Sequence, residues 1–103
     1  MRFILIDNDS GYIWGDSADL GGRIFTGSPI EFARALDERL GEHGLSYEVV
    51  SRSRLGINEI GYLVYSAPDG FPVIEDGQDQ DTIDAVEREC KYITAIRRFR
   101  HAG

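Results

Sequence analysis

The chain has 103 residues, of which 42% are hydrophobic, and a formal net charge of −7. This length fits a single domain over residues 1–103, with enough apolar residues for one core. The acidic balance argues against direct nucleic-acid binding, and no stretch is apolar enough for a secretory signal or a membrane helix. The single cysteine, Cys90, excludes a disulfide framework and favours a reducing, cytoplasmic location.

The N-terminal part of the chain predicts short strands. The apolar run Phe3–Ile6 ends at the turn-forming residues Asp7–Gly11, and Tyr12–Trp14 follows as a second β-like run. We expect these two runs to form a hairpin. The segment Arg23–Thr26 is a candidate for a further short strand.

The clearest helix signal begins at Ser28. This serine, with Pro29 next and Glu31 three positions on, forms a capping box with proline at the first helical position. Apolar residues then recur at helical spacing, and Gly41 or Gly44 is expected to end the helix.

The middle of the chain predicts three more strands. Tyr47–Arg52 and Tyr62–Tyr65 are rich in β-branched and aromatic residues, and Ala67–Gly70 is a turn sequence. Phe71–Ile74 is expected to return as a partner strand. Pro72 cannot donate to a ladder, so this strand is expected at a sheet edge.

A final helix is predicted to start after Asp79 or Asp81 and to run to about Phe99. Its expected apolar stripe consists of Ile83, Val86, Cys90, Ile93 and Ile96. Residues 97–103 would then form a basic C-terminal tail.

The order of these elements predicts an α+β fold. We expect a mostly antiparallel sheet of four to six short strands, with two helices packed on one of its faces.

No metal site is predicted, and Asp7 and Asp9 are weak candidates for one. They follow an apolar strand, where a carboxylate pair can hold Mg²⁺. Residues 3–9 resemble the first motif of haloacid-dehalogenase-type phosphatases. However, Gly11 replaces the usual Thr or Val, and Lys91 is the only lysine. No role is carried over, and an aspartate-rich hairpin turn is the favoured interpretation.

No other residues suggest catalysis or a cofactor. His43 is expected at the end of the first helix, where a histidine is usually solvated, and His101 lies close to the C-terminus. Cys90 falls on an apolar stripe and is expected to be a buried structural residue. The chain is therefore predicted not to be an enzyme and to need no cofactor.

Charge is distributed unevenly along the chain. Residues 69–89 hold eight acids and one base, whereas residues 90–103 hold four bases and no acid. Acids before a helix and bases at its end suit the helix dipole, which is one explanation. The other is an acidic face for a protein partner with a basic or nucleic-acid-binding surface, formed by Glu75, Asp76, Asp79, Asp81, Asp84 and Glu87.

Aromatic residues offer a second candidate surface. Exposed Tyr and Trp are enriched among residues that dominate binding energy at protein interfaces. The candidates lie on short predicted strands and are Tyr12, Trp14, Tyr62 and Tyr65. The alternative is that they cap the core, and for any single one of them this is the favoured interpretation.

The first functional hypothesis is therefore a non-catalytic binding or regulatory protein that acts through protein–protein contacts. Acidic inhibitors and nucleic-acid mimics of phage or plasmid type are an analogy at the level of class. One alternative is a metal-dependent phosphoryl-transfer or hydrolytic domain that uses Asp7 and Asp9. The other is a homo-oligomer, such as a homodimer, that pairs through the Pro72 edge or the last helix.

Overall fold

The chain begins with the expected hairpin. The computed structural model describes residues 1–19 and 27–100. Strand β1 (Phe3–Asp7) pairs antiparallel with β2 (Ile13–Asp16), and an irregularity in the register falls between Leu5 and Ile6. Gly11 closes the turn at a φ of 76°, which favours glycine. The predicted strand Arg23–Thr26 lies outside the described residues.

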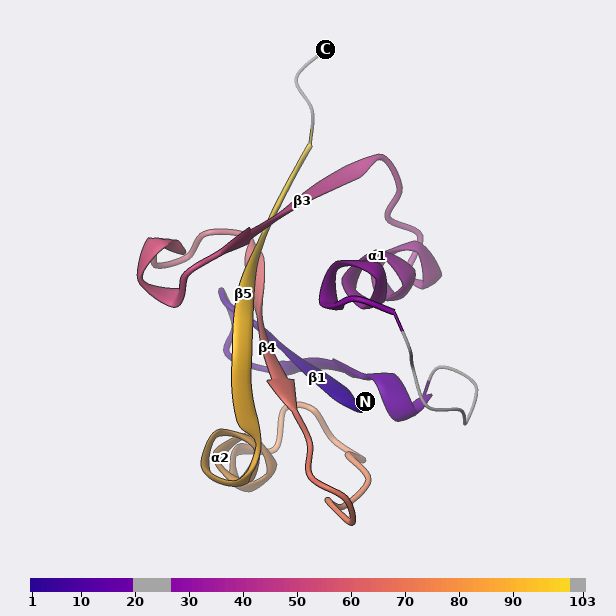
Figure 1. The fold of residues 1–103 in the computed structure, drawn as a ribbon, viewed down its shortest axis with the longest axis vertical. Helices are drawn as coiled ribbons and strands as arrows, with labels where there is room; N and C mark the ends of the chain where they lie inside the picture. The colour runs from indigo at the N-terminus through magenta and orange to yellow at the C-terminus, as the bar shows by residue number, and fades with distance from the viewer. Residues whose placement is uncertain (20–26, 101–103) are drawn as a thin grey trace.

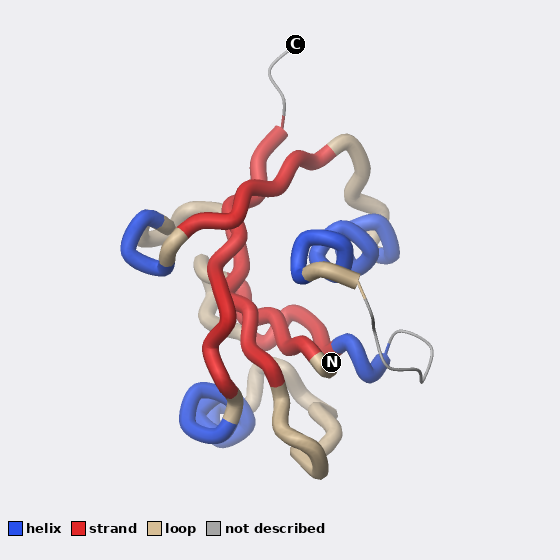
Figure 2. Tube along the Cα trace, in the orientation of Figure 1, coloured by secondary structure: helices blue, strands red, loops and turns tan. Residues whose placement is uncertain are grey.

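The described strands form one antiparallel sheet of five in the order β2-β1-β4-β5-β3. Figures 1 and 2 show the sheet nearly edge-on, with β3 crossing in front of β5. With the two α-helices, this confirms the predicted α+β fold and antiparallel sheet. The remaining strands are β3 (Leu45–Val50), β4 (Gly61–Ser66) and β5 (Lys91–Arg100).

Both helices begin at side-chain caps. Helix α1 (Pro29–Arg39) starts after Ser28, whose hydroxyl accepts a hydrogen bond from the Glu31 N–H at 3.2 Å, as the capping box predicts. Helix α2 (Gln80–Glu89) starts after Asp79, whose carboxylate accepts from the Thr82 N–H at 3.1 Å. Two short 3₁₀ turns complete the helical segments: η1 (Ser17–Asp19) and η2 (Arg52–Arg54).

The helices pack on opposite faces of the sheet, so the expectation that they share one face is wrong. Phe3 and Leu5 of β1 belong to the core cluster that contains the buried residues of α1. Ile4 and Ile6 belong to the cluster that contains the buried residues of α2. Neighbouring residues of a strand point to opposite faces. The continuous apolar run of β1 is therefore buried on both sides.

The final helix is ten residues long and does not reach Phe99. After Cys90 the chain enters β5 directly, so Ile93 and Ile96 belong to a strand. Beyond Cys90 the sequence contains Tyr, Ile and Thr in succession, and these residues favour a strand over a helix. Residues 97–100 are consequently the end of β5 and not a tail, and residues 101–103 lie outside the described part.

The segment Phe71–Ile74 is not a strand, so Pro72 does not mark a sheet edge. The Phe71 side chain is buried in the α2-side core. The guanidinium of Arg2 donates to the Phe71 carbonyl at 2.6 Å and to the Pro72 carbonyl at 3.0 Å. These side-chain contacts satisfy the backbone groups that a sheet partner would otherwise satisfy.

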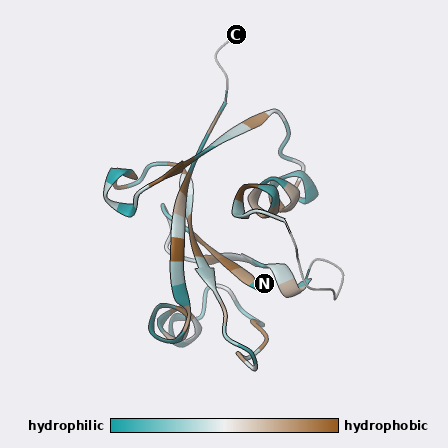
Figure 3. Ribbon diagram, in the orientation of Figure 1, coloured by the Kyte–Doolittle hydropathy of each residue, from teal (hydrophilic) through white to brown (hydrophobic). Residues whose placement is uncertain are grey.

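Hydropathy follows this layering. Figure 3 shows hydrophobic stretches along the strands, while α2 is largely hydrophilic. Among the described residues, no helix is long and apolar enough to span a membrane.

Candidate protein-binding surface

All six members of the predicted acidic face are exposed. Three of them also support local structure. Asp79 caps α2, Asp76 accepts from the Gln78 N–H at 2.9 Å, and Asp84 accepts from the Gln80 amide at 2.8 Å. The side chains of Glu75, Asp81 and Glu87 make no hydrogen bond or ion pair with another described residue. Half of these carboxylates therefore stabilise the start of α2 or the turn before it, in agreement with the explanation from helix structure. The other half face solvent.

Three of the four bases that follow in the sequence, Arg97, Arg98 and Arg100, pair with acids outside this acidic surface. Arg97 pairs with Glu59 at 2.6 Å and with Glu48 at 3.3 Å, both distant from α2 in the chain. Arg98 pairs with Asp37 at 3.2 Å, and Arg100 pairs with Glu42 at 2.7 Å. Within the described part of residues 69–89, the one ion pair is the exposed contact between Arg88 and Glu89, at 3.5 Å.

The four candidate aromatic residues divide into two groups. Tyr12 and Trp14 are 44% and 41% exposed. Tyr62 and Tyr65 are only 1% and 3% exposed, so the prediction that they form a binding surface is wrong. Their strand, β4, is covered on both faces, because the two helices lie on opposite sides of the sheet.

The segment that begins the acidic face, residues 75–77, lies against strand β2, which holds Trp14. The Ile13 N–H of β2 donates to the Gly77 carbonyl at 2.8 Å. A Cβ at Gly77 would lie less than 3.0 Å from the Ile13 carbonyl oxygen, so only glycine allows this approach without displacement. Ile13 stands between Tyr12 and Trp14, and Gly77 directly follows Asp76. The connection that carries Glu75 and Asp76 therefore lies against the β2 edge, whereas the ring of Trp14 stacks on Tyr62 on the α1 side of the sheet.

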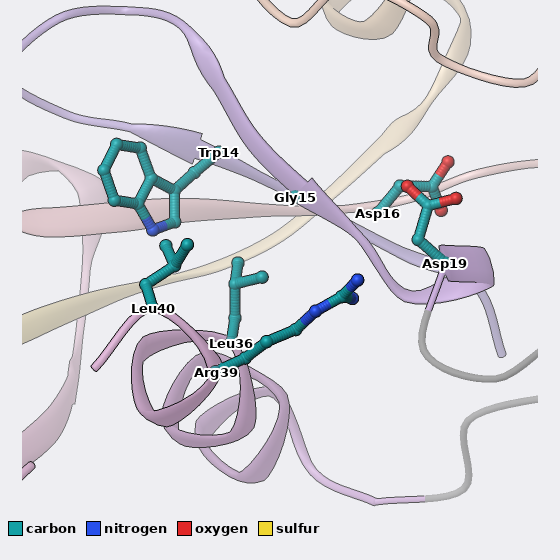
Figure 4. A pocket seen from close by; sticks show the side chains of 7 residues that line it. All are labelled: Trp14, Gly15, Asp16, Asp19, Leu36, Arg39 and Leu40. Atoms are coloured by element: carbon teal, nitrogen blue, oxygen red, sulfur yellow. The ribbon is translucent and has the colours of Figure 1, made fainter. Parts of the chain in front are cut away.

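A surface hollow of about 430 Å³ lies beside Trp14, between β2 and the last turns of α1. Figure 4 shows Trp14 and Leu40 on one side of it, with the Arg39 side chain extending past Leu36. Asp16 and Asp19 complete the lining. The indole ring stacks on the buried Tyr62 ring at 6.4 Å between centroids, which supports Trp14 from beneath. An exposed, supported indole beside a hollow is well suited to receive a side chain of a partner.

The Tyr62 hydroxyl belongs to a buried polar cluster centred on Asp37 of α1, which is fully buried. Its carboxylate accepts hydrogen bonds from the hydroxyls of Tyr47 and Tyr62, each at 2.6 Å, and pairs with Arg98. Burial, followed by the hydrogen bond to Asp37, raises the pKa of both tyrosines above its ordinary value. The cluster holds α1 to strands β3, β4 and β5.

Asp37 was not among the residues predicted to be functional. The available signal was its helical phase, since the buried face of α1 runs through Phe32, Ala33 and Leu36 to this aspartate. An acid at an apolar position needs partners. Those partners come from strands distant in sequence, so they could not be named in advance.

Asp7 is part of a turn. Its Oδ2 accepts from the Ser10 N–H at 3.0 Å and from the Ser10 hydroxyl at 2.7 Å. This is the aspartate turn that was the favoured interpretation of the motif. Asp9 is exposed, and the described residues contain no group of three or more His, Cys, Asp or Glu placed to hold a metal ion.

Two of the remaining candidates, Cys90 and His43, lie in the described part of the chain and in different segments of it. Cys90 is buried at the junction of α2 and β5, as expected of a structural cysteine, and burial raises the pKa of its thiol. His43 is exposed after α1, and its carbonyl accepts from Arg100 at 3.2 Å. His101 lies outside the described residues.

Comparisons with models of protein families, with curated proteins and with solved structures find no match to this chain.

Proposed function

We propose that this protein is a non-catalytic binding protein that engages a protein partner through the β2–acidic surface. This surface consists of the exposed aromatic residues Tyr12 and Trp14 together with the acidic residues Glu75, Asp76, Asp79, Asp81, Asp84 and Glu87. The observation that carries the proposal is the contact between Ile13 and Gly77, which brings the segment that bears Glu75 and Asp76 to the strand that bears Trp14.

The two parts of this surface contribute differently to binding. Aromatic side chains at the centre of an interface supply most of the binding energy, and Trp14 is exposed beside a hollow while its ring is held by Tyr62. Carboxylates around them steer the partner and set specificity. The chain thus supports anchoring at Trp14 and steering by residues 75–87.

The chemistry of the surface selects a basic partner. Eight acids and one base in residues 69–89 repel acidic surfaces, including nucleic acid. A positively charged protein surface, such as the nucleic-acid-binding groove of another protein, is the complementary class. Binding as an inhibitor that occupies such a groove follows from this complementarity. The single cysteine is consistent with such a role in the cytoplasm.

Affinity capture from a lysate of the source cells, followed by titration of the purified partner, tests the proposal. The charge reversal Asp81→Lys with Asp84→Lys should weaken binding about tenfold or more, which corresponds to about 1.4 kcal/mol. Trp14→Ala should weaken binding by at least a similar factor. Affinity of the unmodified protein should fall as salt is raised.

The matched control reverses two exposed acids of α1, Glu31→Lys with Glu38→Lys, which changes net charge equally. The affinity of this control for the partner should stay within about threefold of that of the unmodified protein, because only the change in net charge affects it. Equal losses for the two double variants would show that bulk charge alone governs binding. That outcome, or a partner indifferent to Trp14→Ala, contradicts the proposed surface.

Gly77→Ala tests whether the two parts must be joined. The added Cβ should push the acidic segment away from β2 while leaving every acidic and aromatic side chain in the protein. We expect weaker binding and a thermal midpoint lowered by a few degrees. Gly56→Ala is the control, because its Cβ would meet only the flexible Glu59 side chain. Full affinity of Gly77→Ala would show that the junction is not needed.

A further inference from the structure

Strand β3 lies at one edge of the sheet, and no described strand pairs with its outer side. The sheet order ends at β3, which pairs with β5 through all six of its residues. Among the described residues, no segment other than β5 hydrogen-bonds to the backbone of Leu45–Val50. Val49 is 56% exposed, and neither proline nor lysine interrupts the strand. Such an edge is a template for another strand.

The outer edge of β2 differs in this respect. Gly77 already hydrogen-bonds to β2 at Ile13, so residues beside it cover part of that edge. At β3, by contrast, an incoming strand could pair with the outer side of all six residues of the strand.

The side chains of β3 favour pairing with a second β3. Two strands related by a twofold axis through Tyr47 place Leu45 opposite the second Val49, and Ser46 opposite the second Glu48. These are an apolar pair and a polar pair on opposite faces of the sheet. Centring the axis on Glu48 instead would oppose two like charges, which is destabilising. The antiparallel register centred on Tyr47 is thus self-complementary.

Charge does not oppose contact between copies at this edge. The arginines of β5 that lie beside β3 are each paired with acids of the same copy: Arg97 with Glu59 and Glu48, Arg98 with Asp37, and Arg100 with Glu42. The acidic segment contacts β2, four strand spacings away, roughly 19 Å at about 4.8 Å each. This exceeds the screening length of about 8 Å at physiological salt, so the acidic surfaces of two copies would repel only weakly.

We propose that two copies of this chain associate through antiparallel pairing of their β3 strands, which creates a continuous ten-stranded sheet. The contact uses the edge opposite the β2–acidic surface, so each copy keeps that surface free. The protein is then a twofold-symmetric dimer with two distant acidic surfaces. This association is independent of any partner and is measured on the isolated protein.

Sedimentation and light scattering over a range of concentrations test this association. The unmodified protein should shift from monomer to dimer as concentration rises. Ser46→Lys should strengthen the dimer severalfold, because the new ammonium faces Glu48 of the second copy. Ser46→Glu should weaken it severalfold by placing two carboxylates opposite each other. Circular dichroism and thermal melts establish that both variants fold.

Cross-linking tests the register. A mixture of Leu45→Cys and Val49→Cys proteins should form a disulfide-linked heterodimer under mild oxidation, since directly opposed residues lie within disulfide reach. Each variant alone should not, because its own two cysteines would be about four residues out of register. The proposal is overturned by a strict monomer at millimolar concentration, by equal effects of Ser46→Lys and Ser46→Glu, or by absence of the mixed cross-link.

Discussion

At the scale of single residues, the burial of the charged Asp37 side chain carries a large desolvation free energy that the fold must offset. A carboxylate removed from water is strongly unfavourable unless it is paired and hydrogen-bonded. Here two tyrosine hydroxyls and Arg98 meet it. The guanidinium of Arg98 also donates to the Tyr62 hydroxyl at 2.9 Å, which closes the network. Because each group depends on the others, loss of one leaves buried polar atoms without partners.

Asp37→Asn should therefore destabilise the protein by about 2–4 kcal/mol, because the amide keeps the shape but removes the charge opposite Arg98. Urea unfolding at neutral pH measures the change. Glu38→Gln, one position along on the exposed side of α1, should change stability by less than about 0.5 kcal/mol. A difference of under about 0.5 kcal/mol between Asp37→Asn and the original protein would refute the role given to this cluster.

Residue-scale inference from sequence succeeded where the signal is local. The Ser28 cap and the Asp7 turn each depend on residues within three positions, and both were expected. The buried state of Tyr62 depends instead on α1 and on Trp14 packing against its ring. Alternation along a strand indicates two faces but not whether each is covered, so the sequence could not decide which of the four candidate aromatic residues is exposed.

At the scale of elements, the start of α2 was predictable and its end was not. Two acids were candidate caps, and Asp79 is the one that serves. Beyond the helix, Ile93 and Ile96 continue the helical spacing by coincidence, and no Gly or Pro separates helix from strand. Without a breaker, periodicity alone extended the helix into β5.

The cap itself can be separated from the charge it carries. Asp79→Ala should cost about 1 kcal/mol of unfolding free energy, because the Thr82 N–H loses its acceptor. Asp79→Asn removes the same charge but keeps an acceptor, so it should cost only a few tenths of a kcal/mol. Thermal unfolding of the three proteins side by side provides the comparison. Equal losses in both variants would assign the effect to charge and not to capping.

At the scale of the whole molecule, the sheet with a helix on each face explains the two largest differences from the sequence analysis. Burial on both sides accounts for the continuous apolar run of β1 and for the buried tyrosines of β4. Composition and element order were sufficient to predict an antiparallel α+β fold. They could not assign the helices to faces, because that depends on how the connections between strands cross the sheet.

The stability of the whole fold should fall at alkaline pH. The pKa of Tyr47 and of Tyr62 is raised in the folded protein, by burial first and then by the hydrogen bond to Asp37, above the value of about 10 in the unfolded chain. The folded state therefore holds these protons more tightly. Stability is complete below about pH 10 and decreases as the pH rises beyond it, by up to about 1.4 kcal/mol per pH unit for each tyrosine.

Urea unfolding between pH 8 and pH 11, combined with tyrosine absorbance, measures this loss. Tyr62→Phe should lower stability at neutral pH, because Asp37 loses a donor, and should make the alkaline decline shallower. If the decline has the same slope in Tyr62→Phe and in the original protein, the raised pKa of Tyr62 does not contribute to it.

The direct passage from α2 into β5 through Cys90 limits how the chain can be altered. An inserted or deleted residue at this junction would shift the register of β5 by one residue, so that each of its side chains would point to the opposite face of the sheet. Ile96 and Arg98 would then move to the α2 side of the sheet, and Arg97 would move to the α1 side. Changes of chain length are thus incompatible with the fold at residue 90, whereas the exposed connection around Gly41 and His43 has no such register to keep. A tag, reporter or linker is best inserted there.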